Sequence, residues 1–258
     1  MTASVPPVQP GEGRPSDAAH WARPVSKLKV SDVPVGAINL NVEGREVVGP
    51  LQGFGQMWQN TFRVRLNGVK VSPAEVIRAW KENIASFQPS DNHFYPSLAG
   101  VKPGEVVFID TRLPVLPGLP GILPFASGVM VLYADDECFT VMTPEGFPEA
   151  GWNTFSAYVE DECAVAQVQS IVRANDPIYE IGLRFMGGAR KQEQVWTYVL
   201  TALAAHFGVA GQVQVHKTCL DPQLQWSQAK NVWHNAGIRT TLYILAAPLR
   251  WVGKLFKR

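Results

Sequence analysis

The sequence predicts an α+β fold in which an antiparallel sheet packs against one long helix that follows it. Between Glu105 and Arg173, apolar stretches of strand length alternate with turns rich in proline, glycine or acidic residues. In Gln192–Phe207 the spacing becomes helical, with the bulky apolar residues on one stripe. Of the 258 residues, 46% are hydrophobic, which is enough to bury a substantial core.

The N-terminal region carries few signals of regular structure. Residues 1–27 are rich in proline and offer little to bury, so we predict a disordered leader. Residues 28–56 predict irregular structure with at most one short strand. The first clear strand is Trp58–Leu66, where apolar and polar residues alternate. Ser72-Pro73-Ala74-Glu75 then predicts a helix start, with a capping serine, proline at the first position and an acid after it.

A series of hairpins follows. We predict strands at Glu105–Leu113, Ser127–Ala134, Cys138–Thr143, Trp152–Val159 and Ala164–Arg173. Because short acidic or proline-containing turns join these strands, consecutive strands are expected to pair as an antiparallel meander.

Two helices are predicted after Pro177. Ile178–Phe185 is short, Gln192–Phe207 is long, and the glycine pair of FMGGARKQ is typical of a hinge between them. The chain therefore divides into a leader (1–27), one folded domain (28–209) and a C-terminal strand and helix extension (210–258) that ends in a basic amphipathic tail.

Four stretches of the domain resemble a family. They are GFGQMWQNTFRVRL (Gly53–Leu66), ASGVMVLYADDECFTVMTPEG (Ala126–Gly146), GWNTFSAY (Gly151–Tyr158) and VAQVQSIVRANDPIYEIG (Val165–Gly182). Together they resemble an uncharacterised bacterial branch of the START-like, or SRPBCC, superfamily. The PEGFPEAG turn is similar to a START-related family shared by bacteria and plants.

The resemblance implies a helix-grip fold, in which a curved antiparallel sheet wraps around a long C-terminal helix and leaves a cavity between them. It covers roughly Gly53 to Val209. It also implies the binding of lipids, sterols or polyketides, and some members of the superfamily catalyse cyclisation or dehydration. One fold hosts many functions, so these roles are expectations only.

Three predicted strands offer faces that could line such a cavity. Side chains alternate between the two faces of a strand, so each strand has one partly polar face and one apolar face. The partly polar faces are Val106, Phe108, Asp110 and Arg112, then Trp152, Thr154, Ser156 and Tyr158, and then Gln167, Gln169, Ile171 and Arg173. They would supply the few polar groups that orient a mostly apolar ligand. The alternative is that these faces meet solvent and the core contains Val107, Ile109, Phe155, Val168 and Val172.

The first of these interpretations defines a set of ligand-binding residues. They are Phe108, Asp110, Arg112, Trp152, Thr154, Tyr158, Gln169 and Arg173, together with Trp196 and Val199 from the stripe of the long helix. In a dry cavity Asp110 could pair with Arg112 or Arg173 and anchor a ligand carboxylate or hydroxyl. An exposed cross-strand ion pair is the alternative. Glu180 and Arg184, four apart, predict a pair that stabilises the short helix.

Motifs for metal or nucleophilic chemistry are missing from the sequence. His216 and Cys219 form an HxxC pair, but no second pair of ligands lies nearby, and tetrahedral zinc requires four. Neither a G-x-S-x-G elbow nor a glycine-rich phosphate loop occurs. His93 and Tyr95 are placed in a loop that could overhang a cavity mouth. We predict no metal, no cofactor and no catalytic residue.

The C-terminal tail combines an apolar stripe with positive charge. No acidic residue follows Asp221, and apolar residues recur at four- and three-residue spacing from Ile238 onward. Such a helix suits an anionic membrane surface, with Trp251, Lys254 and Phe256 as the predicted contacts. Pro248 would kink it. Docking on its own domain, a homodimer contact and disorder are the alternatives.

Charge, cysteine count and apolar run length argue against three further classes of protein. A net charge of +1 argues against a nucleic-acid partner, and three cysteines are too few for a disulfide framework. No apolar run approaches the ~20 residues of a membrane-spanning helix. We expect a cytoplasmic protein, with peripheral membrane contact left open.

Three functions stay open at this point. The first is a carrier of an apolar small molecule, and the second is a cyclase or dehydratase that uses Asp110, Tyr158 or Arg173. The third is an interaction module that binds a protein partner through its C-terminal helix.

Overall fold

The computed structural model describes residues 17–113 and 123–247 of the chain. Within these ranges eight strands form one sheet: β1 (Met57–Arg65), β2 (Asn92–Tyr95), β3 (Val106–Leu113), β4 (Leu123–Ala134), β5 (Cys138–Met142), β6 (Glu149–Glu160), β7 (Cys163–Ala174) and β8 (Gln214–Asp221). Their order across the sheet is β2-β3-β4-β5-β6-β7-β1-β8, and all neighbours pair antiparallel. The predicted fold class, with its meander from β3 to β7, is confirmed.

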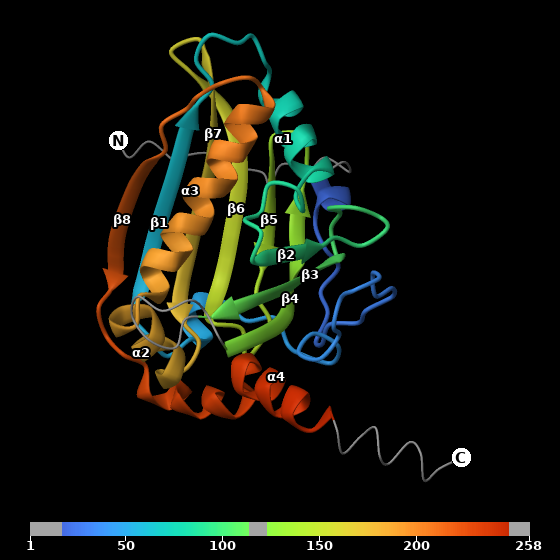
Figure 1. Cartoon of the computed structure of the whole chain (residues 1–258), viewed down its shortest axis with the longest axis vertical. Helices are drawn as coiled ribbons and strands as arrows, with labels where there is room; N and C mark the ends of the chain where they lie inside the picture. Colours follow the sequence, from blue (N-terminus) through green and yellow to red (C-terminus); the bar gives the residue numbers. More distant parts are fainter. Residues whose placement is uncertain (1–16, 114–122, 248–258) are drawn as a thin grey trace, which may run out of the picture.

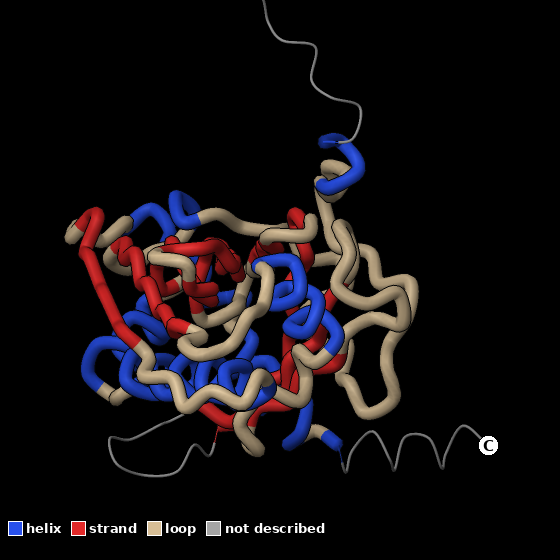
Figure 2. The backbone as a smooth tube through the Cα atoms, turned by 90° about the horizontal axis from the view of Figure 1, so that it is seen from above, coloured by secondary structure: helices blue, strands red, loops and turns tan. Residues whose placement is uncertain are grey.

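Helices α1 (Pro73–Glu82) and α3 (Gly188–His206) lie against the concave face of this sheet. The described residues also form α2 (Pro177–Phe185) and α4 (Ala236–Leu245), and the 3-10 segments η1 (Asp17–His20), η2 (Pro50–Gln52) and η3 (Trp226–His234). The long helix α3 runs across β1 and β7 (Figure 1). Seen from above, the strands curve around the helices (Figure 2). This is the helix-grip arrangement of a curved sheet around a long C-terminal helix.

The start of α1 follows the sequence signal closely. The hydroxyl oxygen of Ser72 accepts a hydrogen bond from the Glu75 backbone N–H at 3.3 Å, and the Glu75 carboxylate accepts one from the Ser72 N–H at 2.8 Å. Pro73 occupies the first helical position. The capping box therefore satisfies two backbone donors that the helix itself leaves unpaired.

The main core lies between the concave face and the helices. Trp80 of α1 packs edge-on against Phe155 of β6 at a ring distance of 5.2 Å. Phe155 in turn stacks on Phe139 of β5 at 4.5 Å. Leu200 and Leu203 of α3 are fully buried in the same cluster. Burial of these large apolar side chains fixes how the two helices sit on the sheet.

A smaller apolar layer covers part of the convex face. Leu28 and Val42 pack there on Phe108 and Met130 of the sheet. Residues 17–27 belong to the predicted leader, yet the structure places them on the same side: His20 Nδ1 lies 2.9 Å from the Ala134 carbonyl oxygen. Residues 1–16 of the leader lie outside the described residues.

One strand differs from the sequence prediction. The SDNHFYPSLAG segment was expected to be a loop, but Asn92–Tyr95 forms β2 and pairs with β3 at the edge of the sheet. Four residues are too few for an alternating pattern to stand out. Residues 28–56 are irregular as predicted, apart from η2 and a single bridge between Val47 and Pro144.

The C-terminal extension packs on its own domain through small side chains. Ala236, Gly237 and Thr240 are the buried residues of α4, and the Thr240 hydroxyl accepts a hydrogen bond from Asn41 Nδ2 at 3.1 Å. The predicted apolar stripe points the other way, since Leu242 is 60% exposed and Leu245 is 70% exposed. Residues 248–258, with Trp251, Lys254 and Phe256, lie outside the described residues.

No helix in residues 17–113 and 123–247 has the length and apolar character needed to cross a membrane.

Candidate functional site

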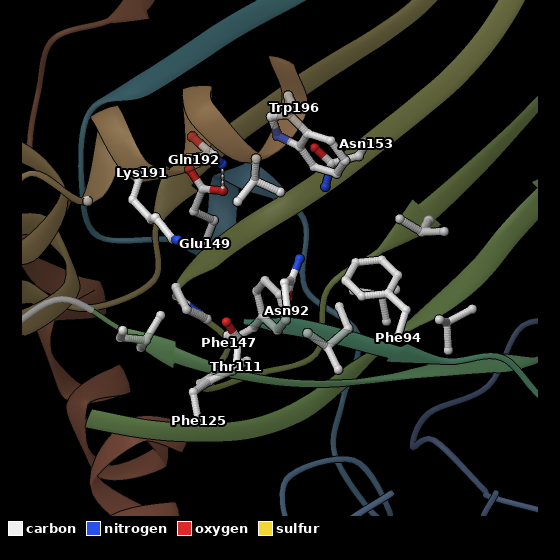
Figure 3. Close-up of a pocket in the computed structure, with 18 of the residues that line it drawn as sticks. Asn92, Phe94, Thr111, Phe125, Phe147, Glu149, Asn153, Lys191, Gln192 and Trp196 are labelled. Carbon is white, nitrogen blue, oxygen red and sulfur yellow. Dashed lines mark hydrogen bonds between the residues drawn. The ribbon is translucent and has the colours of Figure 1, made fainter. Parts of the chain in front are cut away.

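A cavity of about 190 Å³ lies between the N-terminal half of α3 and the concave face of the sheet. Most of its lining is aliphatic or aromatic, with a few polar side chains among them (Figure 3). The apolar lining includes Ile84, Phe94, Val107, Ile109, Leu113, Phe125, Val129, Val141, Phe147, Phe155, Leu183, Val195 and Trp196. This composition is typical of a site for an apolar small molecule.

Strand alternation decides which side chains reach this cavity. On β3 the row Val107, Ile109 and Thr111 faces inward, and on β6 the row Asn153 and Phe155 does the same. Residues one position away point to the convex face, because the side-chain period of a strand is two. Arg112, near the end of β3, is the exception, since it also lines the cavity. The cavity is therefore lined by the rows that contain the apolar core residues.

Glu149 is the buried acid of the cavity. It starts β6, is 8% exposed, and its carboxylate accepts a hydrogen bond from the side chain of Gln192 on α3. Burial raises the pKa of Glu149 to about 7, although the Gln192 hydrogen bond and the charge of Lys217 both oppose the shift. Glu149 can therefore hold or release a proton near neutral pH, which an exposed glutamate does not do.

Two further polar side chains of the cavity each have a buried atom without a hydrogen-bond partner in the described structure. These atoms are Asn153 Oδ1, an acceptor, and Trp196 Nε1, a donor. The Trp196 ring packs on Phe155 at 5.6 Å, and Asn153 is the next inward-facing residue along β6. Figure 3 shows both at the same end of the cavity. An unpaired buried polar atom is costly, so a polar group of a ligand that paired with either atom would be stabilised.

An ion pair joins α3 to the edge of the sheet beside the cavity. Lys191 Nζ lies 2.6 Å from Asp91 Oδ2, and this hydrogen bond lowers the pKa of Asp91. Lys191 lines the cavity, and Asp91 directly precedes β2, whose Asn92 and Phe94 line it as well. The pair therefore ties two walls of the cavity together where it opens to solvent.

The structure corrects the choice of strand face. Trp152 and Thr154 lie on the convex side, where they border a shallow hollow with Trp21 and Tyr133. Phe108 is buried in the convex apolar layer. Tyr158 shares the convex row of β6 with Trp152, and Gln169 donates a hydrogen bond to Thr61 at 3.2 Å outside the cavity. Polarity alone could not identify the inner face, because the convex face also carries aromatic and half-buried residues.

The predicted Asp110–Arg173 anchor is not formed. The Arg173 guanidinium is fully buried and donates to the Asp221 carboxylate, to the Gly55 carbonyl oxygen at 2.6 Å and to the Gln223 carbonyl oxygen at 2.9 Å. It therefore joins β7 to two neighbouring segments. Asp110 lies opposite His93 in the β2–β3 pairing, and burial raises its pKa while His93 and Arg112 oppose the shift.

The last three residues of the predicted ligand-binding set lie in or near the cavity. Trp196 and the exposed Arg112 line the cavity, and Val199 is fully buried in the core one helical turn beyond it. Sequence reasoning missed Glu149, Asn153 and Gln192. Glu149 and Asn153 could have been found from their phase, because they lie six and two residues before Phe155, on the same face of the strand.

The residues of the other sequence motifs have defined positions in the structure. Glu180 and Arg184 form the expected pair on α2 at 3.9 Å. The glycine pair joins α2 to α3, and Gly187 takes a left-handed φ of 80°, which favours glycine. His216 and Cys219 lie three positions apart on β8, so their side chains point to opposite faces. No group of three or more potential metal ligands occurs among the described residues.

No protein-family model matches the chain, and no curated protein matches it in sequence. Solved structures do match in fold. The NMR structure of the KanY protein gives a TM-score of 0.44 at 10% identity, over 60% of this chain and 99% of that one. A protein from Rhizobium leguminosarum gives 0.40 at 16% identity, over 59% and 96%. Major latex-like protein 151 from Panax ginseng gives 0.36 at 11% identity, over 59% and 99%. We draw no function from likeness at this level.

Proposed function

We propose that this protein binds and carries an apolar small molecule in the cavity beneath α3. The observation that carries the proposal is the cavity itself: about 190 Å³ of space walled mainly by aliphatic and aromatic side chains. An engineered apolar cavity of about 150 Å³ takes up benzene, so this one has room for a body of about one ring. The lipid-, sterol- or polyketide-like ligands implied by the START-like resemblance would extend beyond it.

Binding is driven by the removal of ligand apolar surface from water. Each 100 Å² of ligand surface buried contributes about 2.5 kcal/mol before the cost of association is subtracted. A ring-sized ligand therefore binds with modest affinity, and additional affinity has to come from polar groups or from a larger ligand.

The test uses ethylbenzene as a probe and full-length protein. We expect saturable binding by titration calorimetry and a rise in melting temperature, because a ligand that binds only the folded state stabilises it. Val195→Trp places a large side chain in the cavity and should abolish binding. Tyr198→Trp, on the exposed side of the same helix, is the matched control and should leave binding unchanged. The absence of any apolar-probe binding to the parent protein would refute the proposal.

The membrane is a proposed loading site for the ligand. The exposed stripe of Ile238, Leu242 and Leu245 on α4 leads into a tail whose charged residues are all basic. An exposed apolar stripe beside a basic segment suits an anionic surface, at roughly 1 kcal/mol per basic residue. Truncation after Ala247 should abolish pelleting with phosphatidylserine vesicles. It spares Thr240, whose hydrogen bond to Asn41 holds α4 on the domain. If truncation instead abolishes a dimer and leaves pelleting intact, the tail is a subunit contact.

Acid–base catalysis is the second candidate function, and Glu149 favours it. A general acid or base works best with a pKa near the operating pH, and burial raises the pKa of Glu149 to about 7 within the cavity. Native mass spectrometry of freshly purified protein would identify any co-purifying compound. If the protein converts that compound, Glu149→Gln should abolish conversion and leave ethylbenzene binding unchanged. Equal conversion by the variant would exclude this role.

A further inference from the structure

A second pocket adjoins the cavity on the other side of Glu149. It has a volume of about 180 Å³ and is lined by residues of β1, β7, β8, α2 and α3. Glu149, Leu183 and Gln192 line both spaces. The partition between the two pockets is therefore built from side chains, and two of these are joined by the Gln192–Glu149 hydrogen bond.

A row of polar residues crosses the concave face from one pocket to the other. Asn153 of β6 pairs in register with Ser170 of β7, Ser170 with Asn60 of β1, and Asn60 with Lys217 of β8. Asn153 lines the cavity, and Asn60 and Lys217 line the second pocket. The concave face of such a sheet normally supplies apolar packing, so this row is an exception to the composition around it.

Several atoms of this row and its surroundings are buried without a partner. Ser170 is fully buried and its hydroxyl has no hydrogen bond within the described structure, as is also true of Asn153 Oδ1 and Trp196 Nε1. A buried hydroxyl without a partner destabilises the fold, so a ligand group that pairs with it would be stabilised there. Together the three atoms offer one donor, one acceptor and one hydroxyl that can do either.

The charged groups around the second pocket are already engaged. Arg184 lies 3.9 Å from Glu180, and Lys217 lies 2.6 Å from Glu193. A charged ligand group would have to compete with these pairs. The groups left to receive a ligand from the pockets are the neutral amides of Asn153 and Asn60. The Ser170 hydroxyl lies buried between these two residues, outside both linings, and a ligand reaches it only when the partition opens.

We propose that the two pockets are subsites of one elongated site, and that its ligand is amphipathic: an apolar body in the cavity and a neutral head bearing hydroxyl or amide groups along the Asn153–Ser170–Asn60 row. This rests on the proposed function. The side chains of Glu149 and Gln192 turn aside to let the head pass. The head then replaces hydrogen bonds that the folded chain leaves unmade, which makes the row a determinant of specificity.

The experiment compares three probes that share a phenyl ring. Ethylbenzene has no head, 3-phenylpropane-1,2-diol has a neutral head, and 3-phenylpropanoate has an anionic head. We expect the diol to bind about fivefold more tightly than ethylbenzene, as one or two net hydrogen bonds allow, and more tightly than the carboxylate. The diol should also shift the Trp196 Nε1–H resonance, assigned by its loss in Trp196→Phe.

Ser170→Ala tests the row directly. Because the hydroxyl is unpaired, its removal should leave the melting temperature unchanged or raise it, which a structural hydrogen bond would not allow. Affinity for the diol should fall to about that for ethylbenzene, an approximately fivefold loss. Ser156→Ala, on the convex face of β6, is the control, because Ser156 accepts only a 3.5 Å hydrogen bond from Gln167 there. Ser156→Ala should leave the affinities for ethylbenzene and for the diol unchanged.

The outcomes separate this inference from the proposed function. If ethylbenzene fails to bind, the proposed function is refuted and the inference falls with it. If ethylbenzene binds but the diol binds no more tightly, only the inference is overturned. If 3-phenylpropanoate binds more tightly than the diol, the inference that the ligand has a neutral head group is overturned. A Ser170→Ala variant that weakens both probes equally, or melts at a lower temperature, overturns the role of the row.

Discussion

Helix α3 covers the concave face along its whole length, but its two halves have different surroundings. The C-terminal half presents Val199, Leu200, Leu203 and Ala204, all fully buried against β1 and the other core residues. The N-terminal half presents Lys191, Gln192, Val195 and Trp196 to the cavity. The C-terminal half therefore packs in the solid core, and the N-terminal half borders the cavity.

This difference shows how one helix can serve both stability and binding. A solid core holds its side chains in place and tolerates few changes in volume. The cavity end has unpaired polar atoms and a buried acid, each of which costs free energy of folding. The close packing at one end offsets that cost and holds the other end open.

The largest expected effect comes from Leu200→Ala at the solid end. Deletion of a buried leucine side chain should cost about 2–5 kcal/mol, because it removes apolar contacts and leaves a cavity. Val195→Ala at the cavity end should cost less than about 1 kcal/mol, because Val195 is half-buried and already borders open space. Urea unfolding followed by circular dichroism measures both values.

The same two variants should differ in binding. Leu200→Ala should keep its affinity for ethylbenzene at temperatures where it stays folded, whereas Val195→Ala should change it. Equal losses of stability at both positions would show that the two halves of α3 are packed alike, and would contradict the comparison.

Next in size is the effect of Glu149→Gln, which depends on pH. The folded pKa of about 7 lies above the ordinary value of 4.5, so the folded chain keeps a proton that the unfolded chain has released. The free energy of unfolding contributed by this group therefore falls as pH rises from about 4.5 to about 7, and is constant above that. The variant should be more stable than the parent by roughly 3 kcal/mol at pH 8, and nearly equal to it at pH 4.5.

A matched substitution checks the origin of this effect. Glu82→Gln changes an exposed glutamate of α1 and should show no comparable difference between pH 4.5 and pH 8. If Glu149→Gln destabilises the protein at pH 8, the carboxylate is stabilised by its partners more strongly than burial penalises it. That result would also remove the argument for acid–base catalysis.

A smaller loss of stability should follow from removal of the Ser72 cap of α1. Ser72→Ala removes the hydroxyl that accepts from the Glu75 N–H and should cost about 1 kcal/mol. Because no residue of α1 lines the cavity, the affinity for ethylbenzene should not change. A loss of binding without a loss of stability would show that α1 controls the cavity.

Most strands and helices could be predicted from the sequence because the patterns that indicate them are local. Alternation at Trp58–Leu66, the cap at Ser72 and the stripe at Gln192–Phe207 each depend on a few neighbouring residues. β2 was missed because its four residues are too few for an alternating pattern to stand out.

The inner face of the sheet could not be predicted in the same way. A shift of one position exchanges the faces of a strand, and on β6 both rows mix polar with apolar residues. Trp152 suggested an inward row, and Glu149 belongs to the PEGFPEAG stretch that the sequence assigned to a turn. The structure reverses both, since the convex side is covered in part and the carboxyl is buried beneath α3. The cavity and its acid therefore depend on long-range packing that no local pattern records.

The smallest expected change in stability concerns the ion pair beside the cavity. Lys191 and Asp91 are 36% and 47% exposed, and exposed pairs contribute only about 0.2–1 kcal/mol. Lys191→Gln should therefore barely change the free energy of unfolding. It should nevertheless speed the exchange of bound ethylbenzene, because it unties α3 from the residue that precedes β2. Exchange rates from NMR line shapes measure this. Arg65→Gln removes exposed pairs with Glu160 at 2.6 Å and Asp161 at 3.3 Å, far from the cavity, and should also change stability little, without changing exchange. If bound ethylbenzene exchanges at the same rate in both variants, ligands enter the cavity elsewhere. The N-terminal half of α3 would then line the cavity without controlling entry to it.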